Sequence, residues 1–314
     1  MGHFVFKVLS RSFLLGLYFR FQNSRFQVCN TWNLESEILE SEICPKGMPS
    51  AKFKMMIQFL YNLYFRYWKR WGWFGDFPNW QAAQAACGGY DSDEIIEKVR
   101  VSALKVINGE AAFERDSVLF FEEENDGNLL KCLEKATFTE GALRVIDFGG
   151  SLGSTYFQHL KALKKYPNLI WCVVEQPHFV EIGKREFETE NLYFEYTLQA
   201  AFERFKPHFF LLNSVLQYIE KPYDLLKEVE NLKIPYILIQ RTPMIDDTQD
   251  RITQQIAHPS VYKASYPSWV FGEKYFKSKL ANSWTIDWEQ REKYGLHHVA
   301  SKPLFLKDLF LSNI

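Results

Sequence analysis

The chain has 314 residues, of which 47% are apolar and 24% charged, and its formal net charge is −1. This composition excludes a disordered chain, and the length suffices for one large α/β domain with an appendage or for two small domains. The balanced charge argues against a nucleic-acid partner. The five cysteines and seven histidines lack C-x-x-C and H-E-x-x-H spacings, so we predict no metal site.

Residues 1–50 are expected to form an N-terminal extension that does not span a membrane. Within residues 1–25 the longest uncharged run, Ser12–Phe19, is too short to cross a bilayer. Arg11 and Arg20 interrupt what would have to be the apolar core of a signal peptide. Met48 precedes the next organised segment and is an alternative start of translation. We therefore expect a cytoplasmic protein.

Residues 51–74 combine five cations with many aromatic side chains and no acid. A helix of this composition is typical of segments that lie in the headgroup layer of an anionic membrane. It would make the protein peripheral at the inner face of the membrane. The other interpretation is a helix that packs its aromatic side chains on the rest of the protein and leaves a basic edge in solvent.

Under the first interpretation, deleting residues 1–70 should reduce flotation of the protein with anionic liposomes and leave flotation with neutral liposomes unchanged. Each cation contributes roughly 1 kcal/mol near an anionic surface, and added salt should weaken the effect. Equal flotation of both proteins with both kinds of liposome would favour the packing interpretation.

The second region, residues 51–140, continues from this helix into a predicted helical cap. The spacing predicts a short helix over Trp80–Ala86 and a longer one that Asp91 caps and Asn108-Gly109 ends. The apolar positions of the longer helix recur at helical spacing, at Ile95, Val99, Leu104 and Ile107.

In the third region, residues 141–314, short apolar strands alternate with helical stretches, which is the pattern of a parallel sheet wrapped by helices. The expected strands are Leu143–Asp147, Leu169–Glu175, Leu192–Tyr196, His208–Asn213 and Pro235–Gln240, with two more at Trp284–Trp288 and Pro303–Phe310. The expected helices are Ser154–Lys165, His178–Glu188 and Tyr223–Asn231. We predict an α/β fold with a Rossmann-like sheet flanked by helices and preceded by an N-terminal helical extension.

A glycine-rich turn joins the first of these strands to its helix. Gly149 permits a tight turn, Gly150 leaves room for a ligand beside the backbone, and Gly153 lets the helix pack closely. Ser151 replaces the second glycine of the dinucleotide fingerprint, so no pyrophosphate site is predicted. The spacing Asp-x-Gly-x-x-x-Gly fits S-adenosylmethionine, whose amino-acid end the loop would wrap and whose ammonium Asp147 would reach directly or through water.

Polar residues follow two more of these strands at the same edge of the sheet. Glu175 and Gln176 follow the second strand, where a carboxylate can accept hydrogen bonds from both ribose hydroxyls. The alternative for Glu175 is an exposed strand-end carboxylate. Asn213 and Ser214 end the fourth strand, where the methyl group would lie. We predict that all four bind the cofactor.

Residues that follow the fifth strand are expected to serve the methyl acceptor. Arg241 is placed either to bind an anionic group of the acceptor or to pair with Asp246 or Asp247. The sequence does not identify the base that a hydroxyl acceptor needs. The candidates by position are His258, Tyr266 and Asp246.

From about Trp71 onward the chain resembles a family of bacterial S-adenosylmethionine-dependent methyltransferases linked with surface-polysaccharide biosynthesis. The motifs that carry the resemblance are Trp73-Phe74-Gly75-Asp76, Gly89-Tyr90-Asp91, Glu114-Arg115-Asp116, Asp147 to Tyr156, Val174-Glu175-Gln176-Pro177, Leu216-Gln217-Tyr218, Arg241-Thr242-Pro243 and Tyr262-x-x-Ser-Tyr266-Pro267.

The resemblance implies a class I methyltransferase that O-methylates a sugar or polysaccharide intermediate. It also draws attention to Tyr90 and Arg115, either as a lid over the cofactor and the acceptor or as anchors of the N-terminal helices. Two alternatives stay open. One is a methyltransferase for another small molecule or a lipid, and the other is a catalytically silent Rossmann-like scaffold in a membrane-associated complex.

Overall fold

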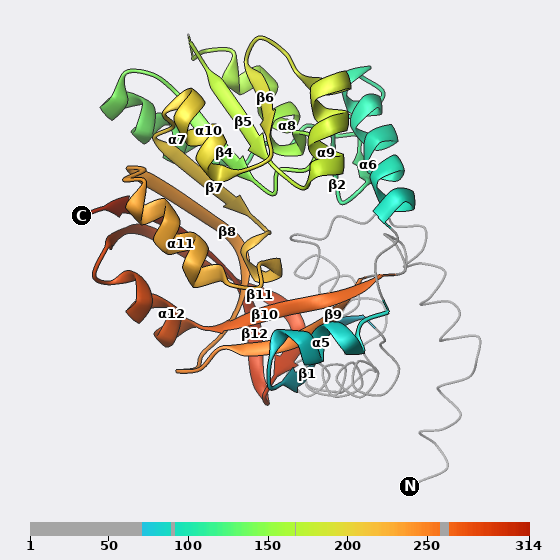
Figure 1. The fold of residues 1–314 in the computed structure, drawn as a ribbon, viewed down its shortest axis with the longest axis vertical. Coiled ribbons are helices and arrows are strands. Elements are labelled where there is room, and N and C mark those ends of the chain that lie inside the picture. The colour runs from blue at the N-terminus through green and yellow to red at the C-terminus, as the bar shows by residue number, and fades with distance from the viewer. Residues whose placement is uncertain (1–70, 89–91, 167, 258–263) are drawn as a thin grey trace, which may run out of the picture. The chain divides into compact units, whose positions relative to one another are not determined.

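The computed structural model describes residues 71–88, 92–166, 168–257 and 264–314, which belong to one compact unit (Figure 1). The expectations for residues 1–50 and for the basic stretch 51–70 lie outside the described residues. The division of the chain at residues 50 and 140 therefore stays a prediction.

Five parallel strands form the centre of the sheet, in the order β6-β5-β4-β7-β8. They are β4 (Arg144–Phe148), β5 (Ile170–Val174), β6 (Leu192–Glu195), β7 (Phe209–Asn213) and β8 (Tyr236–Ile245). Each overlaps a predicted strand, although β8 runs five residues past its predicted end at Gln240. Numbered by their place among these strands the order is 3-2-1-4-5, the doubly wound arrangement.

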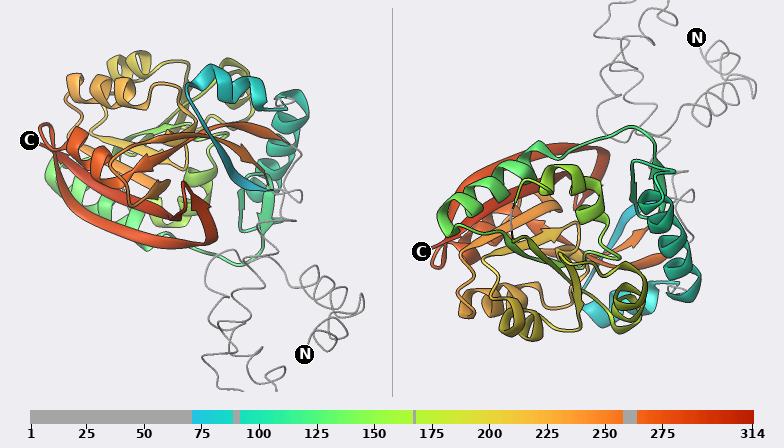
Figure 2. Two further views of the ribbon diagram at one scale, coloured as in Figure 1. Left: turned by 90° about the horizontal axis from the view of Figure 1, so that it is seen from below. Right: turned by 90° about the horizontal axis from the view of Figure 1, so that it is seen from above.

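Helices cover both faces of this sheet (Figure 2). Alternate residues of each strand point to opposite faces, so Val145 and Val173 pack on one side while Ile146 and Cys172 pack on the other. The first layer comprises α6 (Ser92–Ile107), α7 (Gly127–Glu140), α8 (Ser154–Leu163) and α9 (Pro177–Ile182), which a π-helical turn, Gly183–Phe187, follows. The second comprises α10 (Leu198–Phe205), α11 (Pro222–Asn231) and α12 (Glu273–Leu280). The predicted Rossmann-like sheet flanked by helices is confirmed.

Two antiparallel strands extend the sheet beyond β8. They are β11 (Trp284–Val299) and β12 (Lys302–Asn313), and both contain the short strands predicted there. Strand β12 pairs with β8 on one side and with β11 on the other. Strand β12 therefore lies between β8 and β11 in the sheet, although it follows β11 in the chain.

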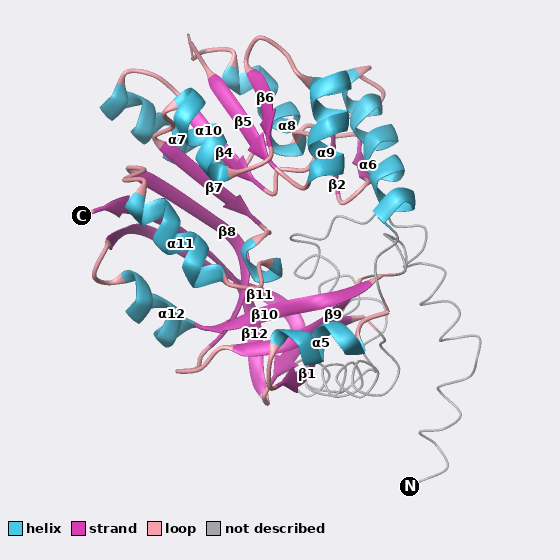
Figure 3. Cartoon of the chain, in the orientation of Figure 1, coloured by secondary structure: helices cyan, strands magenta, loops and turns pink. Residues whose placement is uncertain are grey.

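A second arm of the sheet branches from the end of β8 (Figure 3). It consists of β1 (Gly72–Phe77), β9 (Arg251–Ile256) and β10 (Ser265–Gly272), with helix α5 (Trp80–Ala86) beside it. The end of β10 pairs in parallel with Met244 and Ile245 of β8. The prediction that residues 51–74 are one helix is wrong for residues 72–74. Gly72 has φ +116°, which a helix does not tolerate, and the segment pairs with β9.

A short hairpin lies between α6 and α7, formed by β2 (Phe113–Arg115) and β3 (Val118–Phe120). Asp116 and Ser117 form its turn with φ of 50° and 65°, so both adopt the left-handed conformation of a tight hairpin turn. The buried Glu114 accepts hydrogen bonds from the Ser117 amide, at 3.0 Å, and from the Ser154 hydroxyl in the first turn of α8. These bonds hold the hairpin against the start of α8.

A buried network of charges joins α12 to β11 and β12. Glu273 contacts Lys307 at 2.8 Å, Lys277 at 3.3 Å and the guanidinium of Arg291. Lys307 is only 4% exposed and also reaches Glu289, at 3.0 Å. Burial opposes the charge of Glu273, but the hydrogen bond and charge of Lys307, with the neighbouring cations, lower its pKa to about 2.

Among the described residues, no helix is long and apolar enough to cross a membrane.

Candidate functional site

The direction of strand addition in the parallel sheet reverses between β4 and β7. From β4 the chain continues to β5 and β6 on one side, whereas β7 and β8 lie on the other. Open α/β sheets bind their ligands where the direction of strand addition reverses in this way. Asp147 is the penultimate residue of β4 and Asn213 ends β7, so two of the predicted cofactor-binding residues flank this point.

The glycine-rich turn after β4 is tied to the neighbouring strand. The Gly149 amide donates to the Val174 carbonyl at 2.8 Å, and Gly149 itself has φ +71°. A Cβ atom at Gly149 would lie 2.3 Å from the side chain of Val215, so the turn requires glycine on two grounds. Gly153 has φ +90° and precedes α8 as its N-cap residue.

Asp147 is buried beneath this turn, with 1% of its surface exposed. Its Oδ2 accepts a hydrogen bond of 3.1 Å from the Trp171 indole, while its Oδ1 has no partner among the described residues. A Cβ atom at Gly150 would lie 2.5 Å from the Asp147 carboxyl carbon. Burial raises the pKa of Asp147 to about 7; the Trp171 hydrogen bond opposes this shift and the charge of Glu175 adds to it.

Glu175 follows β5 and turns back toward the glycine turn. Its carboxylate accepts the Gln176 amide at 2.7 Å and also the Ser151 amide. Burial raises its pKa above the ordinary value, and both amide bonds oppose that shift. The side chain is half-buried rather than fully exposed, whereas Gln176 is exposed at the start of α9. Glu175 is thus held beside the loop that Gly149 begins.

The end of β7 presents Asn213 and Ser214. The Asn213 amide nitrogen lies 3.4 Å from the Thr155 hydroxyl in α8, and its Oδ1 is buried without a partner among the described residues. Ser214 has φ +61° and donates its amide to the Gln240 carbonyl at 3.0 Å. The left-handed turn at Ser214 lets the chain leave β7 abruptly.

Arg241 lies in β8, in a backbone conformation that non-glycine residues seldom adopt, with φ +50°. Its amide donates to Asp308 of β12 at 2.7 Å, and its Nε is buried without a hydrogen-bond partner in the described part of the chain. Burial and then the nearby charge of Arg115 lower its pKa, whereas Asp116, Asp308 and Asp126 oppose that shift. Of these residues, Asp308 is the one that directly contacts Arg241.

The pairing of Arg241 with Asp246 or Asp247 is not observed. Asp246 lies 3.9 Å from Lys274, and Asp247 contacts Lys302 at 3.0 Å. The continuation of β8 carries both acids away from Arg241, because each strand residue advances by roughly 3.3 Å.

Arg115 ends β2 and Tyr266 lies in β10. The Arg115 guanidinium lies over the rings of Phe113 and Phe120, at 5.6 and 5.8 Å from their centroids. Tyr266 of β10 meets the Tyr218 ring edge to face at 5.0 Å. Tyr90, which the resemblance drew attention to, and His258, a candidate base, lie outside the described residues. Asp246 is exposed and separate from this group.

Several buried polar atoms at these strand ends have no hydrogen-bond partner among the described residues. They are Asp147 Oδ1, Asn213 Oδ1, Gln217 Oε1, Gln240 Oε1 and Arg241 Nε. Buried polar groups in folded proteins are almost always satisfied. Buried polar atoms without a partner among the described residues also occur elsewhere, as at Arg144 and His208, but Asn213 and Gln240 are register partners on β7 and β8, next to β4. A polar ligand at this edge of the sheet would satisfy them together with Asp147.

Three polar residues near these strands were not among the predicted site residues. They are Asp126, Asp308 and Gln217. Asp126 caps α7 and accepts the Gln240 side-chain amide at 2.7 Å, while its own amide donates to His159 at 3.0 Å. Burial raises the pKa of Asp308 to about 6; the Arg241 amide opposes this shift. The missed Gln217 follows β7 and donates to the Ser214 carbonyl at 2.9 Å.

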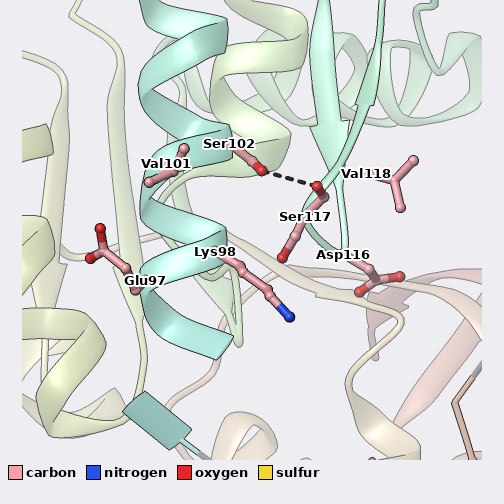
Figure 4. A pocket seen from close by; sticks show the side chains of 7 residues that line it. All are labelled: Glu97, Lys98, Val101, Ser102, Asp116, Ser117 and Val118. Carbon is pink, nitrogen blue, oxygen red and sulfur yellow. Dashed lines mark hydrogen bonds between the residues drawn. The ribbon is translucent and has the colours of Figure 1, made fainter. Parts of the chain in front are cut away.

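A separate open pocket of about 270 Å³ lies between α6 and the β2–β3 turn (Figure 4). Its lining includes Glu97, Ser102 and Asp116, and the Ser102 hydroxyl donates to the Ser117 carbonyl at 2.9 Å. None of its lining residues belongs to β4, β5, β7 or β8. The pocket is therefore separate from the carboxyl ends of these strands. Within the described ranges, no group of three or more His, Cys, Asp or Glu side chains is arranged to hold a metal ion.

No protein-family profile matches the chain, and no curated protein matches it. Solved structures show distant similarity. The N-terminal domain of EvdMO1, in the presence of S-adenosylhomocysteine (SAH) and D-fucose, is 15% identical over 71% of this chain and 97% of that one, with a TM-score of 0.44. The glycopeptide N-methyltransferase MtfA with bound S-adenosylmethionine is 9% identical over 57% and 92%, with a TM-score of 0.37. The 1,6-didemethyltoxoflavin-N1-methyltransferase of Burkholderia thailandensis is 14% identical over 72% and 91%, with a TM-score of 0.36.

Proposed function

We propose that this protein is a methyltransferase that uses S-adenosylmethionine. The observation that carries the proposal is the set of unpartnered buried polar atoms beside a glycine turn at the switch point of the sheet. A ligand with hydroxyl, amine and carboxylate groups would satisfy such atoms.

The residues present fit this cofactor. The turn from Gly149 to Gly153 would hold its amino-acid end. Glycine at positions 149 and 150 lets Val215 and Asp147 pack against this turn. Asp147 supplies a carboxylate near the ammonium, and Glu175 supplies one for the ribose hydroxyls. Asn213 would lie near the methyl group. When bound, the cofactor supplies an activated methyl group; the protein aligns the acceptor with it and excludes water.

We propose that the acceptor is a sugar or polysaccharide intermediate that is methylated on oxygen. Planar polar side chains can form hydrogen bonds with the hydroxyl groups of such an acceptor. Arg241 and Gln240 of β8 and Asp308 of β12 are side chains of this kind. A hydroxyl acceptor also needs a base. Asp308, which accepts the Arg241 amide at 2.7 Å, joins Asp246 as a candidate. Tyr266 and His258 stay predictions.

A direct test begins with calorimetric titration of the purified protein with S-adenosylmethionine and SAH. The protein is then incubated with methyl-labelled S-adenosylmethionine and a panel of free sugars, nucleotide sugars and lipids, and products are identified by mass spectrometry. Transfer to a sugar supports the proposal. Transfer only to a lipid or another small molecule would identify the first alternative function. Cofactor binding without transfer to any of these acceptors would favour the silent scaffold.

Arg241→Gln should leave the affinity for S-adenosylmethionine nearly unchanged while turnover falls by roughly one to two powers of ten. The lost contact is a charge-assisted hydrogen bond to an anionic group of the acceptor, typically about 1.5–3 kcal/mol. Calorimetry measures the first quantity, and the transfer assay measures the second with the acceptor found above. A variant that loses cofactor affinity and keeps acceptor affinity would show that Arg241 has been assigned to the wrong ligand.

A further inference from the structure

The side chains of Trp171 and Asp147 meet inside the protein, on the same face of the sheet. Trp171 of β5 is in register with Val145 of β4, and Asp147 lies two residues beyond Val145. Residues two apart in a strand share a face, so the indole reaches the carboxylate diagonally. Trp171 is fully buried, and its N–H is the only side-chain donor that the described residues give to Asp147.

This single hydrogen bond leaves the other carboxylate oxygen available. Asp147 Oδ1 has no partner among the described residues, and it lies 2.9 Å from where a Cβ of Gly150 would be. Gly150 lies beside this carboxylate, and its missing side chain leaves room for Asp147 beneath the turn. A carboxylate with two free oxygens would be able to rotate, whereas the indole bond to Oδ2 restrains it. Both oxygens lie near Gly150, at 2.6 Å (Oδ2) and 2.9 Å (Oδ1) from the position of its Cβ.

We propose that Trp171 is a positioning residue for the cofactor. Its indole N–H holds the Asp147 carboxylate so that one oxygen stays free to act on the ammonium of bound S-adenosylmethionine. This role rests on the proposed function. A buried indole N–H needs an acceptor, and here that acceptor is the carboxylate of the proposed cofactor site.

The arrangement also makes cofactor binding depend on pH. Burial raises the pKa of Asp147 to about 7; the Trp171 hydrogen bond lowers it, and Glu175 is the charged neighbour that raises it further. A cation bound beside the carboxylate favours its charged form. Binding near or below pH 7 should therefore release a proton, and affinity should weaken as the pH falls through that value.

The test is calorimetric titration of the full-length protein with SAH between about pH 5.5 and about pH 8.5, in buffers of different ionisation enthalpy. The proteins are the wild type, Trp171→Phe, Asp147→Asn and the double variant. Trp171→Phe should bind SAH about tenfold or more weakly at pH 7, because a charge-assisted bond is lost. Its pH midpoint should move upward, since the indole bond no longer lowers the pKa of Asp147. Asp147→Asn should lose the proton release that the wild type shows below pH 7, and the second substitution should then change affinity little.

Equal affinity and equal pH midpoint in the wild type and a folded Trp171→Phe protein would overturn the role. Proton release that persists in Asp147→Asn would also overturn it, and that measurement decides the matter even if Trp171→Phe does not fold. Failure of the wild type to bind either SAH or S-adenosylmethionine would instead refute the proposed function, and this role with it.

Discussion

Gly150→Arg is expected to abolish binding of S-adenosylmethionine in a protein that still folds. A Cβ atom at this position would lie 2.5 Å from the Asp147 carboxyl carbon, so the carboxylate or the loop must move. The longer arginine side chain would also occupy the space that the amino-acid end of the cofactor needs, and its charge would compete with the ammonium for Asp147. We expect affinity to fall at least about hundredfold in a calorimetric titration.

The matched control is Gly127→Arg, at the start of α7. A Cβ atom at Gly127 meets nothing within 4 Å, so this variant adds the same side chain in open space. It should bind the cofactor as the wild type does. Circular dichroism of both variants checks that the sheet has formed. Undiminished binding of S-adenosylmethionine by a folded Gly150→Arg protein would contradict the assignment of the glycine turn to the cofactor.

Glu273→Gln should lower the free energy of unfolding by about 3 kcal/mol. The substitution keeps the shape of the side chain but removes the charge that Lys307, Lys277 and Arg291 share. Lys307 would then keep only Glu289 as an acidic partner in the described network, although it is almost fully buried. Removing one partner of a buried ion pair typically costs about 3–5 kcal/mol. Chemical denaturation at neutral pH measures the difference.

Glu134→Gln serves as the control, because its ion pair with Lys165 is exposed and spans 3.3 Å. Its effect should stay below about 1 kcal/mol. Acid supplies a second check. The pKa of Glu273 is lowered to about 2, so its contribution is complete above its unfolded pKa of about 4.3 and is lost as pH falls toward 2. The gap between wild type and variant should close over that range, and a gap that stays constant would contradict the assignment.

The parallel strands were predictable because each is a short apolar run that ends at a polar residue or a turn. The second arm was not, because β1 pairs with β9 across about 180 residues of sequence and neither strand has a strong apolar alternation. The full length of β8 was hidden by Pro243, which is ordinarily a sign that a central strand has ended. In the structure Pro243 lies opposite Leu306 within the sheet.

The same contrast applies to the site. Asp147, the glycines and Glu175 belong to local patterns at successive strand ends, so their positions followed from strand assignment alone. Trp171 and Asp308 act through partners on other strands, at β4 and β8. Finding Trp171 would have required the register of β4 against β5, which no local pattern supplies. One signal was present, namely a tryptophan in a buried strand whose N–H needs an acceptor.

The position of β12 between β8 and β11 sets an order for folding. As the chain is synthesised, β4 to β8 can pair and collect their helices while the outer edge of β8 remains open. That edge carries unpaired backbone groups until residues 302–313, which pair with it in the folded protein, emerge. Nascent chains stalled between residues 245 and 300 should therefore be prone to pair with one another through β8.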